Sequence, residues 1–263
     1  MSLAGEERIA AAFATSGKRA ALMPYLMGGY PDLDSSRRIG EAAAAAGADL
    51  LELGIPFSDP LADGPVIHDA ATHALAAGAG VDSVLEVAAA LGRLLPVIVM
   101  TYVNILLAPG VESFVERLAE SHVSGLIVPD LPIEEAGEVA AAASGAGIAL
   151  VPLVAPTTPQ ERLDRIGALA RGFMYVVSVT GTTGERSGAP TSLAPLLARA
   201  HAATTVPVAV GFGISTPAHA AAAADAGADG VIVGSRLVRA AGEAEDPAGA
   251  VGRLVGEFAD ALA

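Results

Sequence analysis

Cysteine is absent from this chain, and lysine occurs only once, at Lys18. The absence of cysteine excludes disulfide bonds, a thiolate nucleophile and cysteine-ligated zinc. Lys18 precedes the first predicted strand, so we place it at the end of the molecule away from the expected site. A lysine Schiff base is therefore excluded as the basis of its chemistry.

Long apolar runs and an excess of positive charge are also missing. The nearest candidate for a membrane span, residues 94–108, is broken by a proline and two polar residues and falls short of the roughly 18 residues required. Charged residues at 6–8 lie where a signal peptide would be apolar. The formal net charge of −14 is opposite to that of a nucleic-acid binder. We therefore expect a cytoplasmic protein with no nucleic-acid or membrane partner.

Histidine is present but is not grouped as in metal sites. Four of the five histidines fall in predicted helices and the other directly follows one, without an HxH or HExxH pattern, and we interpret them as solvated or packing residues. They are His68, His73, His122, His201 and His219. Metal-assisted chemistry is therefore not expected, although carboxylates alone can hold magnesium and that alternative stays open.

What the chain does contain is a regular alternation of short apolar strands and alanine-rich helices. The strands are predicted at 21–27, 49–55, 96–102, 125–130, 148–154, 173–179, 206–212 and 230–235. The helices are predicted at 34–46, 66–91, 112–121, 133–144, 159–170, 192–203, 216–226 and 247–261.

This alternation predicts the fold class. Near-continuous apolar strands are typical of parallel sheets buried on both faces, and strands that alternate with helices build right-handed βαβ units. Eight such units occur in 263 residues without a linker or a shift in composition. We therefore predict an α/β protein that forms one (β/α)₈ TIM barrel with extra short helices over residues 1–263, rather than an open doubly wound sheet.

The stretch LELGIPFSDPLADGP, residues 50–64, carries the first candidates for chemistry. Glu52 interrupts an apolar strand near its carboxyl end, and Asp59 and Asp63 lie in the following loop. Catalytic groups of such barrels occupy these positions, and an unpaired buried carboxylate is costly. The alternatives are a structural carboxylate at Glu52 and ordinary turn residues at the two aspartates.

Glycine-rich loops after the last strands indicate a phosphate site. GFGIST (211–216) joins the seventh strand to a helix, and VGSR (233–236) ends the eighth. Barrels often hold phosphate between these loops, on free backbone N–H groups, although tight turns alone would explain the glycines. Thr216 replaces the third glycine of a dinucleotide fingerprint. A further loop, VTGTTGERSGAP (179–190), either closes over a ligand or is an ordinary surface loop. These residues favour metal-free, cofactor-free acid–base chemistry by carboxylates on a phosphorylated substrate.

Taken together, these segments resemble the tryptophan synthase alpha chain family. Besides residues 50–64, the resemblance rests on MTYVN (100–104), VPDLPIEE (128–135), Tyr175, TTGER (182–186), GFGIS (211–215) and GS (234–235). It covers essentially the whole chain. The resemblance implies a TIM-barrel lyase of tryptophan biosynthesis that cleaves indole-3-glycerol phosphate to indole and glyceraldehyde 3-phosphate by a retro-aldol step.

The resemblance also implies a partner and its cofactor. A tryptophan synthase beta chain would use pyridoxal phosphate to join the indole to serine, in an α₂β₂ heterotetramer, and no cofactor is expected in this chain. The expected partner contacts are Asp59, Pro60, Asn104 and Pro132. The apolar segment 105–109 also fits a partner surface.

The resemblance assigns a role to each site residue. Glu52 would shuttle protons, and Asp63 would accept a hydrogen bond from the indole N–H and stabilise positive charge on the ring. Thr183 would reach Asp63 when its loop closes. The phosphate would be bound by Gly184, Gly213, Gly234 and Ser235. The indole pocket would be formed by Tyr25, Met100, Tyr102, Tyr175 and Phe212, for which core packing is the alternative.

Some features depart from the family pattern and leave rival functions open. Residues 27–32 replace a shorter turn, Tyr25 stands where phenylalanine is frequent, and the spacing after Gly184 differs. The rival functions are a stand-alone indole-3-glycerol phosphate lyase, a non-catalytic barrel that activates a beta chain, and another phosphate-binding barrel such as a sugar-phosphate epimerase.

Overall fold

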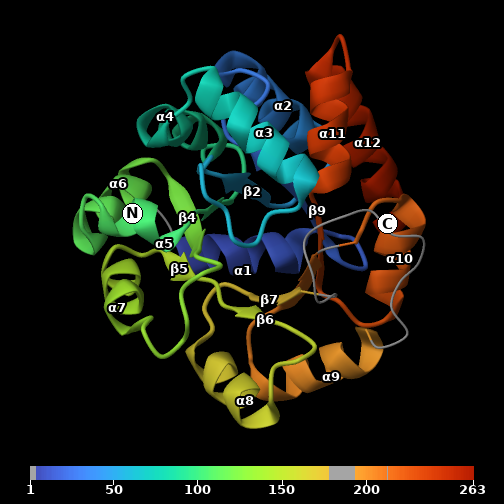
Figure 1. Ribbon diagram of the computed structural model, residues 1–263. Helices are drawn as coiled ribbons and strands as arrows, with labels where there is room; N and C mark the ends of the chain where they lie inside the picture. The colour runs from blue at the N-terminus through green and yellow to red at the C-terminus, as the bar shows by residue number, and fades with distance from the viewer. Residues whose placement is uncertain (1–3, 178–192, 212) are drawn as a thin grey trace.

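The computed structural model describes residues 4–177, 193–211 and 213–263. A curled parallel sheet lies at its centre and is surrounded by helices (Figure 1). The strands are β1 (Ala21–Met27), β2 (Leu51–Gly54), β3 (Val97–Met100), β4 (Val123–Ile127), β5 (Ala149–Leu150), β6 (Leu153–Val154), β7 (Met174–Val177), β8 (Val208–Gly211) and β9 (Gly230–Val233). Their order in the sheet is β5-β4-β3-β2-β1-β9-β8-β7-β6.

The two ends of this order are pieces of one strand, so the sheet closes on itself. β5 and β6 lie within the predicted strand 148–154 and are separated only by Val151 and Pro152. Val151 N donates to Leu126 O at 2.9 Å, and Tyr175 N donates to Pro152 O at 3.0 Å, so the segment stays bonded to β4 and β7. Proline has no N–H to donate, which accounts for the interruption. The predicted (β/α)₈ barrel is confirmed, with its fifth strand divided in two.

Helices cover the outside of the barrel, and one closes its amino-terminal end. They are α1 (Gly5–Thr15), α2 (Leu33–Ala45), α3 (Pro65–Ala76), α4 (Val81–Leu91), α5 (Val103–Leu107), α6 (Val111–Glu120), α7 (Gly137–Gly145), α8 (Gln160–Leu169), α9 (Leu193–Ala203), α10 (Pro217–Asp225), α11 (Ser235–Glu243) and α12 (Pro247–Leu262). α1 lies behind the sheet in Figure 1, and its Ile9 is fully buried in the same cluster as Ile98 and Phe173. This helix therefore plugs the end of the barrel opposite the loops that follow the strands.

The structure corrects the predicted helices in three places. The single predicted helix 66–91 is two helices, α3 and α4, because Gly78 adopts a φ of 89° between them. α7 begins at Gly137 rather than at 133. α1, α5 and α11 had no predicted counterpart among the residue ranges, although extra short helices were expected.

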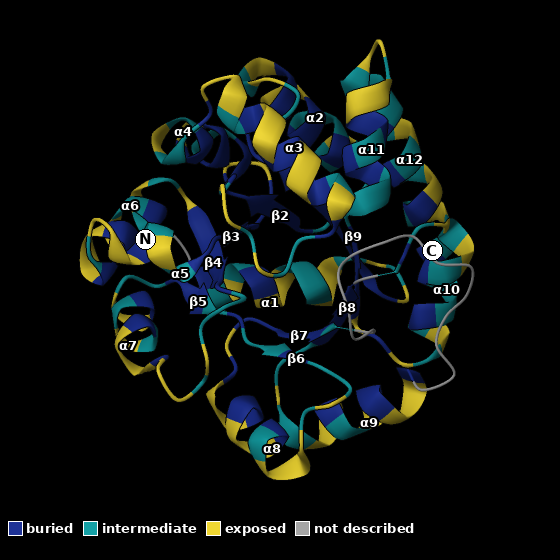
Figure 2. Cartoon of the chain, viewed as in Figure 1, coloured by how far each residue is buried: buried dark blue, intermediate teal, exposed yellow. Residues whose placement is uncertain are grey.

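Successive side chains of each strand point alternately into two buried layers, and this alternation sets the direction of the Glu52 side chain. Leu51 and Leu53 belong to the cluster that packs beneath the helices, so the residue between them faces the barrel interior. Tyr25 of β1 and Ile98 of β3 are paired with Glu52 in register and belong to the interior cluster. Figure 2 shows this buried centre in dark blue beneath an exposed outer surface.

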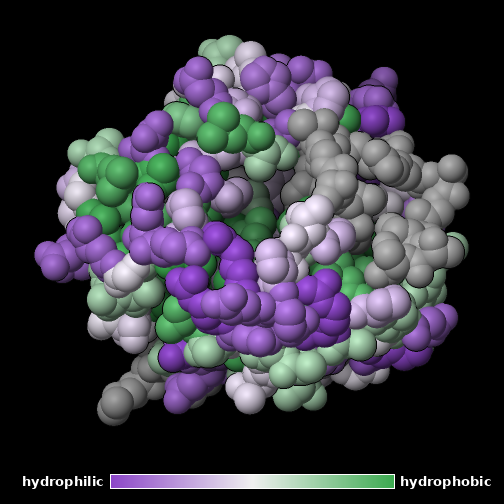
Figure 3. Space-filling view, turned by 60° about the horizontal axis from the view of Figure 1, so that its bottom comes forward, coloured by the Kyte–Doolittle hydropathy of each residue, from purple (hydrophilic) through white to green (hydrophobic). Residues whose placement is uncertain are grey.

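The surface carries few large apolar side chains. Among the described residues the exposed large hydrophobic side chains are Leu61, Leu94, Leu107 and Leu169. Figure 3 shows apolar residues beside a hydrophilic band on one face of the molecule. In the described part of the chain no single helix has the length and apolarity to cross a membrane, although the sharply bent pair α3 and α4 passes on those two criteria alone.

Candidate active site

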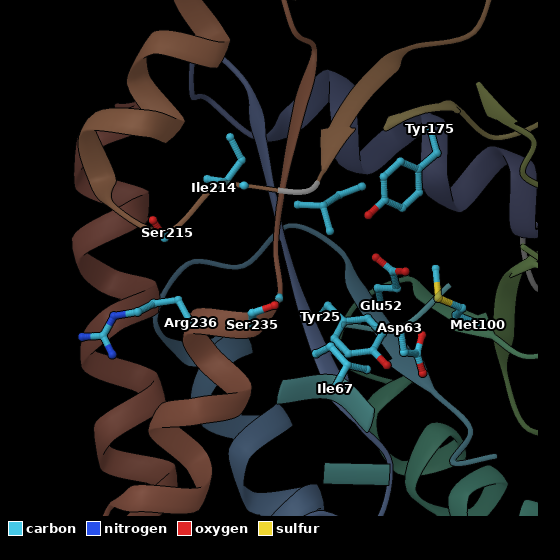
Figure 4. Close-up of a pocket in the computed structure, with 13 residues that line it drawn as sticks. Tyr25, Glu52, Asp63, Ile67, Met100, Tyr175, Ile214, Ser215, Ser235 and Arg236 are labelled. Atoms are coloured by element: carbon cyan, nitrogen blue, oxygen red, sulfur yellow. The ribbon is translucent and has the colours of Figure 1, made fainter. Parts of the chain in front are cut away.

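A cavity lies at the carboxyl ends of the strands, where the sequence places its chemistry. It holds about 590 Å³ of empty space, part of which is open to solvent. β1, β2, β3, β7 and β9 all contribute side chains to its wall (Figure 4). The lining residues are Tyr25, Glu52, Asp63, Ile67, Met100, Tyr175, Gly213, Ile214, Ser215, Ile232, Gly234, Ser235 and Arg236.

Glu52 is buried in this wall. Its exposed fraction is 0%, and neither carboxyl oxygen has a hydrogen-bond partner among the residues that the structure describes. Burial, followed by the negative charge of Asp63, raises the pKa of Glu52 from 4.5 to about 8. At neutral pH Glu52 is therefore predominantly protonated and holds a proton at the edge of the cavity. Among the described residues no backbone amide satisfies this carboxyl.

Asp63 is a carboxyl in a different environment. Its Oδ1 accepts a hydrogen bond from the Tyr102 hydroxyl at 2.9 Å. The pKa of Asp63 is raised above its ordinary value, because burial outweighs the hydrogen bond from Tyr102 and the nearby His68, which both lower it. Two acidic groups thus share one cavity, and their surroundings separate a proton donor, Glu52, from an acceptor, Asp63.

Two tyrosines fill the barrel interior next to Glu52, and two glycines make room for them. A Cβ at Gly54 would collide with the Tyr25 hydroxyl, and a Cβ at Gly211 would collide with that of Tyr175. Burial raises the pKa of both phenols well above its usual value, and the Glu52 charge adds to the effect. Both hydroxyls therefore stay protonated. These rings give the cavity an apolar, aromatic wall around its acidic groups.

The other side of the cavity offers groups suited to an anion. Ser235 begins α11 directly after Gly234, and the first N–H groups of a helix have no partner within the helix. Gly213 adopts a φ of 83°, a conformation that favours glycine. Ser215 and Arg236 complete this side. In Figure 4 Ser235 and Ser215 lie across the cavity from Glu52 and Asp63, while the Arg236 guanidinium points outward.

Most of the predicted site residues come together in the structure. Those that line the cavity are Tyr25, Glu52, Asp63, Met100, Tyr175, Gly213, Gly234 and Ser235. Tyr102 does not line it but lies behind Asp63, to which it is hydrogen bonded. Thr183, Gly184 and Phe212 lie outside the described residues.

Five lining residues were not predicted from the sequence. They are Ile67, Ile214, Ser215, Ile232 and Arg236. Ile214, Ser215 and Arg236 lie within the loops GFGIST and VGSR, which the sequence already marked as candidate phosphate-binding loops. Ile67 and Ile232 carry no signal of this kind, because isoleucine is equally typical of a buried core.

The predicted partner contacts do not line the cavity and lie in the segments that follow β2, β3 and β4. Asp59, Asn104 and Pro132 are exposed, and Pro60 is half-buried. Two large apolar side chains of the same segments are also exposed: Leu61, which is 79% exposed, and Leu107, which is 54% exposed. Within the described ranges, no group of three or more acidic, histidine or cysteine side chains is placed to hold a metal ion.

The chain is similar to known proteins over nearly its whole length. A family model described as tryptophan synthase alpha chain matches residues 12–261. The tryptophan synthase alpha chain of Gloeobacter violaceus is 51% identical over 242 residues, which cover 90% of this chain and 88% of that protein. That of Carboxydothermus hydrogenoformans is 51% identical over 235 residues, or 88% of each chain.

Solved structures agree with these relatives. A chain of Mycobacterium tuberculosis tryptophan synthase superimposes with a TM-score of 0.90 at 37% identity and covers 99% of both chains. A chain of the tryptophan synthase α₂β₂ complex from Pyrococcus furiosus gives a TM-score of 0.86 at 38% identity, covering 92% of this chain and 98% of that one.

Proposed function

Because the chain belongs to the tryptophan synthase alpha chain family, we propose that Glu52 and Asp63 carry out the reaction of that family here. The chain is a lyase that catalyses the alpha reaction, the cleavage of indole-3-glycerol phosphate to indole and glyceraldehyde 3-phosphate. The observation that supports the residue roles is the Glu52 carboxyl, which is fully buried in the wall of the cavity and has no hydrogen-bond partner in the described part of the chain.

The reaction must protonate indole C3 and remove a proton from the side-chain hydroxyl. With its pKa at about 8, Glu52 holds the required proton at neutral pH and donates it to C3. The positive charge that develops on the ring is stabilised by the Asp63 carboxylate, which accepts the indole N–H.

Glu52 then acts as the base for the second half of the reaction. Its carboxylate takes the proton of the hydroxyl that becomes the aldehyde. The bond between C3 and the hydroxyl-bearing carbon breaks, and its electron pair returns to the ring. Neutral indole leaves, and Glu52 is protonated again, so the protein ends the cycle unchanged.

The remaining lining residues bind the two ends of the substrate. Tyr25, Met100 and Tyr175 surround the indole ring. The phosphate is bound at the other side, by the backbone of Gly213 and Gly234 and by the first turn of α11 at Ser235, with Gly184 contributing from outside the described residues.

The chain's partner is a tryptophan synthase beta chain, as in the α₂β₂ complex of the Pyrococcus furiosus relative. The exposed Asp59, Asn104 and Pro132, with Pro60 and the apolar Leu61 and Leu107, form the contact surface in this proposal. Glu52 makes both proton transfers and Asp63 stabilises the charge on the ring, so the alpha reaction needs no cofactor in this chain. Pyridoxal phosphate belongs to the beta chain, which consumes the indole.

The test is a product assay with the purified chain. Indole and glyceraldehyde 3-phosphate are measured after incubation with indole-3-glycerol phosphate, with and without a beta chain. We expect both products in equal amounts and a higher rate with the beta chain. Neither product in either arm would contradict the function, and a rate unaffected by the beta chain would favour a stand-alone lyase.

A further inference from the structure

Tyr102 does not line the cavity but contacts Asp63 and the loop that carries it. Its ring is 4% exposed and lies outside the cavity lining. Its hydroxyl donates to Asp63 Oδ1 at 2.9 Å and accepts from Ala62 N at 3.1 Å. Its ring stacks on Phe57, with centroids 5.3 Å apart and an angle of 29° between the ring planes.

The two hydrogen bonds fix the direction of the tyrosine proton. A backbone N–H can only donate, so the Tyr102 oxygen accepts from Ala62 and its single proton is committed to Asp63. Asp63 must then accept at Oδ1, which leaves its other oxygen for the substrate. This geometry favours the carboxylate form of Asp63 and holds it at a fixed position.

The same residue ties the loop of Asp63 to the barrel. Phe57, Ala62 and Asp63 all belong to the loop between β2 and α3, and all three contact Tyr102. Tyr102 lies two residues beyond the end of β3, as the N-cap of α5, next to Val103, whose N–H donates to Asp130 at 2.9 Å. The loop is therefore held against a rigid strand end through one side chain.

From these contacts we propose that Tyr102 is a positioning residue that acts through Asp63: it orients that carboxylate and keeps one oxygen free for the indole N–H. The proposal rests on the proposed function, because it assigns Asp63 the role of accepting that N–H. It goes beyond it by giving Tyr102 a task that involves no contact with the substrate.

The surroundings of Asp63 make the effect measurable as a function of pH. Asp63 is faced by Tyr102, His68, Glu52 and Tyr25. Among these, Tyr102 provides a hydrogen bond that lowers the pKa of Asp63. Loss of the hydroxyl should raise that pKa, so that Asp63 becomes protonated, and inactive, at a higher pH than before.

The experiment uses Tyr102→Phe, which keeps the ring on Phe57 and removes both hydrogen bonds. We expect kcat/KM for indole-3-glycerol phosphate to fall roughly 10- to 100-fold, since hydrogen bonds to charged groups and the position of a catalytic group are worth about this much. The acidic limb of the kcat/KM profile should move to higher pH by about one unit. Substrate ionisation is the same for both enzymes and cancels in the comparison.

A double-mutant cycle separates positioning from a general structural role. In an Asp63→Asn background, Tyr102→Phe should cost less than threefold, because the group through which it acts is already lost. Tyr30→Phe is the matched control: Tyr30 packs edge-on against His73 at 5.4 Å and does not line the cavity, so its loss of a hydroxyl should leave kcat/KM unchanged.

A carboxyl-carbon NMR titration of Asp63, assigned with Asp63→Asn, supplies a readout that needs no turnover. Tyr102→Phe should raise the pKa of Asp63 even if the protein proved unable to cleave the substrate, which distinguishes failure of this proposal from failure of the proposed function. An unmoved Asp63 titration in a folded Tyr102→Phe variant, or an equal loss of rate in both backgrounds, would overturn the positioning role.

Discussion

Glu52 and Asp63 line the same cavity, and the charge of Asp63 contributes, after burial, to the raised pKa of Glu52. Asp63 is anchored by a hydrogen bond from Tyr102, whereas within the described ranges the Glu52 carboxyl has no hydrogen-bond partner. Glu52 therefore keeps a proton that it can donate at neutral pH, whereas Asp63 accepts a hydrogen bond that favours its carboxylate form. The proposed mechanism requires this difference.

The first prediction concerns the alkaline limb of activity. Because protonated Glu52 donates to indole C3, kcat/KM should fall above about pH 8, the pKa given by burial and Asp63. Asp63→Asn removes the second of these causes, so the limb should move to lower pH while the rate also falls roughly 10²- to 10³-fold. Steady-state pH profiles of both proteins check this. A limb that moved to higher pH in the variant would contradict the coupling.

The second prediction concerns stability. The folded-state pKa of Glu52 is about 8 against 4.5 for the ordinary group, so folded Glu52 retains a proton that the unfolded chain releases. The contribution of this proton to the free energy of unfolding is complete below about pH 4.5. It is lost as the pH rises towards about 8.

Glu52→Gln cannot ionise and should escape this loss. The variant should be more stable than the parent at about pH 8, by a free energy of unfolding on the order of a few kcal/mol, and the difference should shrink towards about pH 5. Urea unfolding at several pH values measures this. A difference that stayed constant with pH would show that Glu52 titrates normally.

The third prediction concerns the space beside Tyr25. A Cβ at Gly54 would collide with the Tyr25 hydroxyl, so Gly54→Ala should lower the free energy of unfolding by about 1–3 kcal/mol. Tyr25→Phe in the same chain should restore only part of this, because the ring carbon that carries the hydroxyl would lie 2.9 Å from the new Cβ. Thermal unfolding of the single and double variants checks the pair.

Gly256→Ala is the matched control for this prediction. Apart from its chain neighbours and the backbone of its own helix, no described atom lies within 4 Å of the new Cβ, and Gly256 is inside α12, so the change should be neutral or slightly stabilising. Equal losses at Gly54 and Gly256 would show that the contact with Tyr25 is not the cause.

The fourth prediction concerns phosphate binding. Ser235→Ala removes one hydroxyl from the first turn of α11, so KM should rise about 10-fold while kcat changes less than about threefold. The exposed Ser144→Ala in α7 is the control and should change neither constant. Steady-state kinetics and inhibition by glycerol 3-phosphate measure the effect. A fall in kcat at unchanged KM would place Ser235 elsewhere in the mechanism.

The barrel and the direction of Glu52 could be predicted from local patterns. Each strand carries a continuous apolar run, and Glu52 lies between two leucines that pack outward, so its inward direction follows from strand alternation. The helix α11 was not predicted from the sequence, because it follows the apolar strand β9 after a single residue and no separate loop marks its start. The break in the fifth strand at Pro152 and the break between α3 and α4 depend on single residues that local composition does not resolve.

The contact between Tyr102 and Asp63 could not be predicted in this way. The two residues are 39 positions apart and meet only because β2 and β3 are neighbours and the loop after β2 folds back over the end of β3. The same holds for Ile67 and Ile232, which reach the cavity through the closure of the barrel. Such contacts depend on tertiary structure, whereas the two carboxyls were marked by the local cost of placing charge in an apolar segment.

The most direct test of the central claim is the rate of indole release from indole-3-glycerol phosphate by Glu52→Gln. Glutamine keeps the shape of the side chain but cannot shuttle a proton. We predict a loss of about 10²- to 10⁴-fold in kcat/KM with folding retained, measured beside the parent chain. A Glu52→Gln variant that released indole at the parent rate would contradict the proton transfer on which the whole account rests.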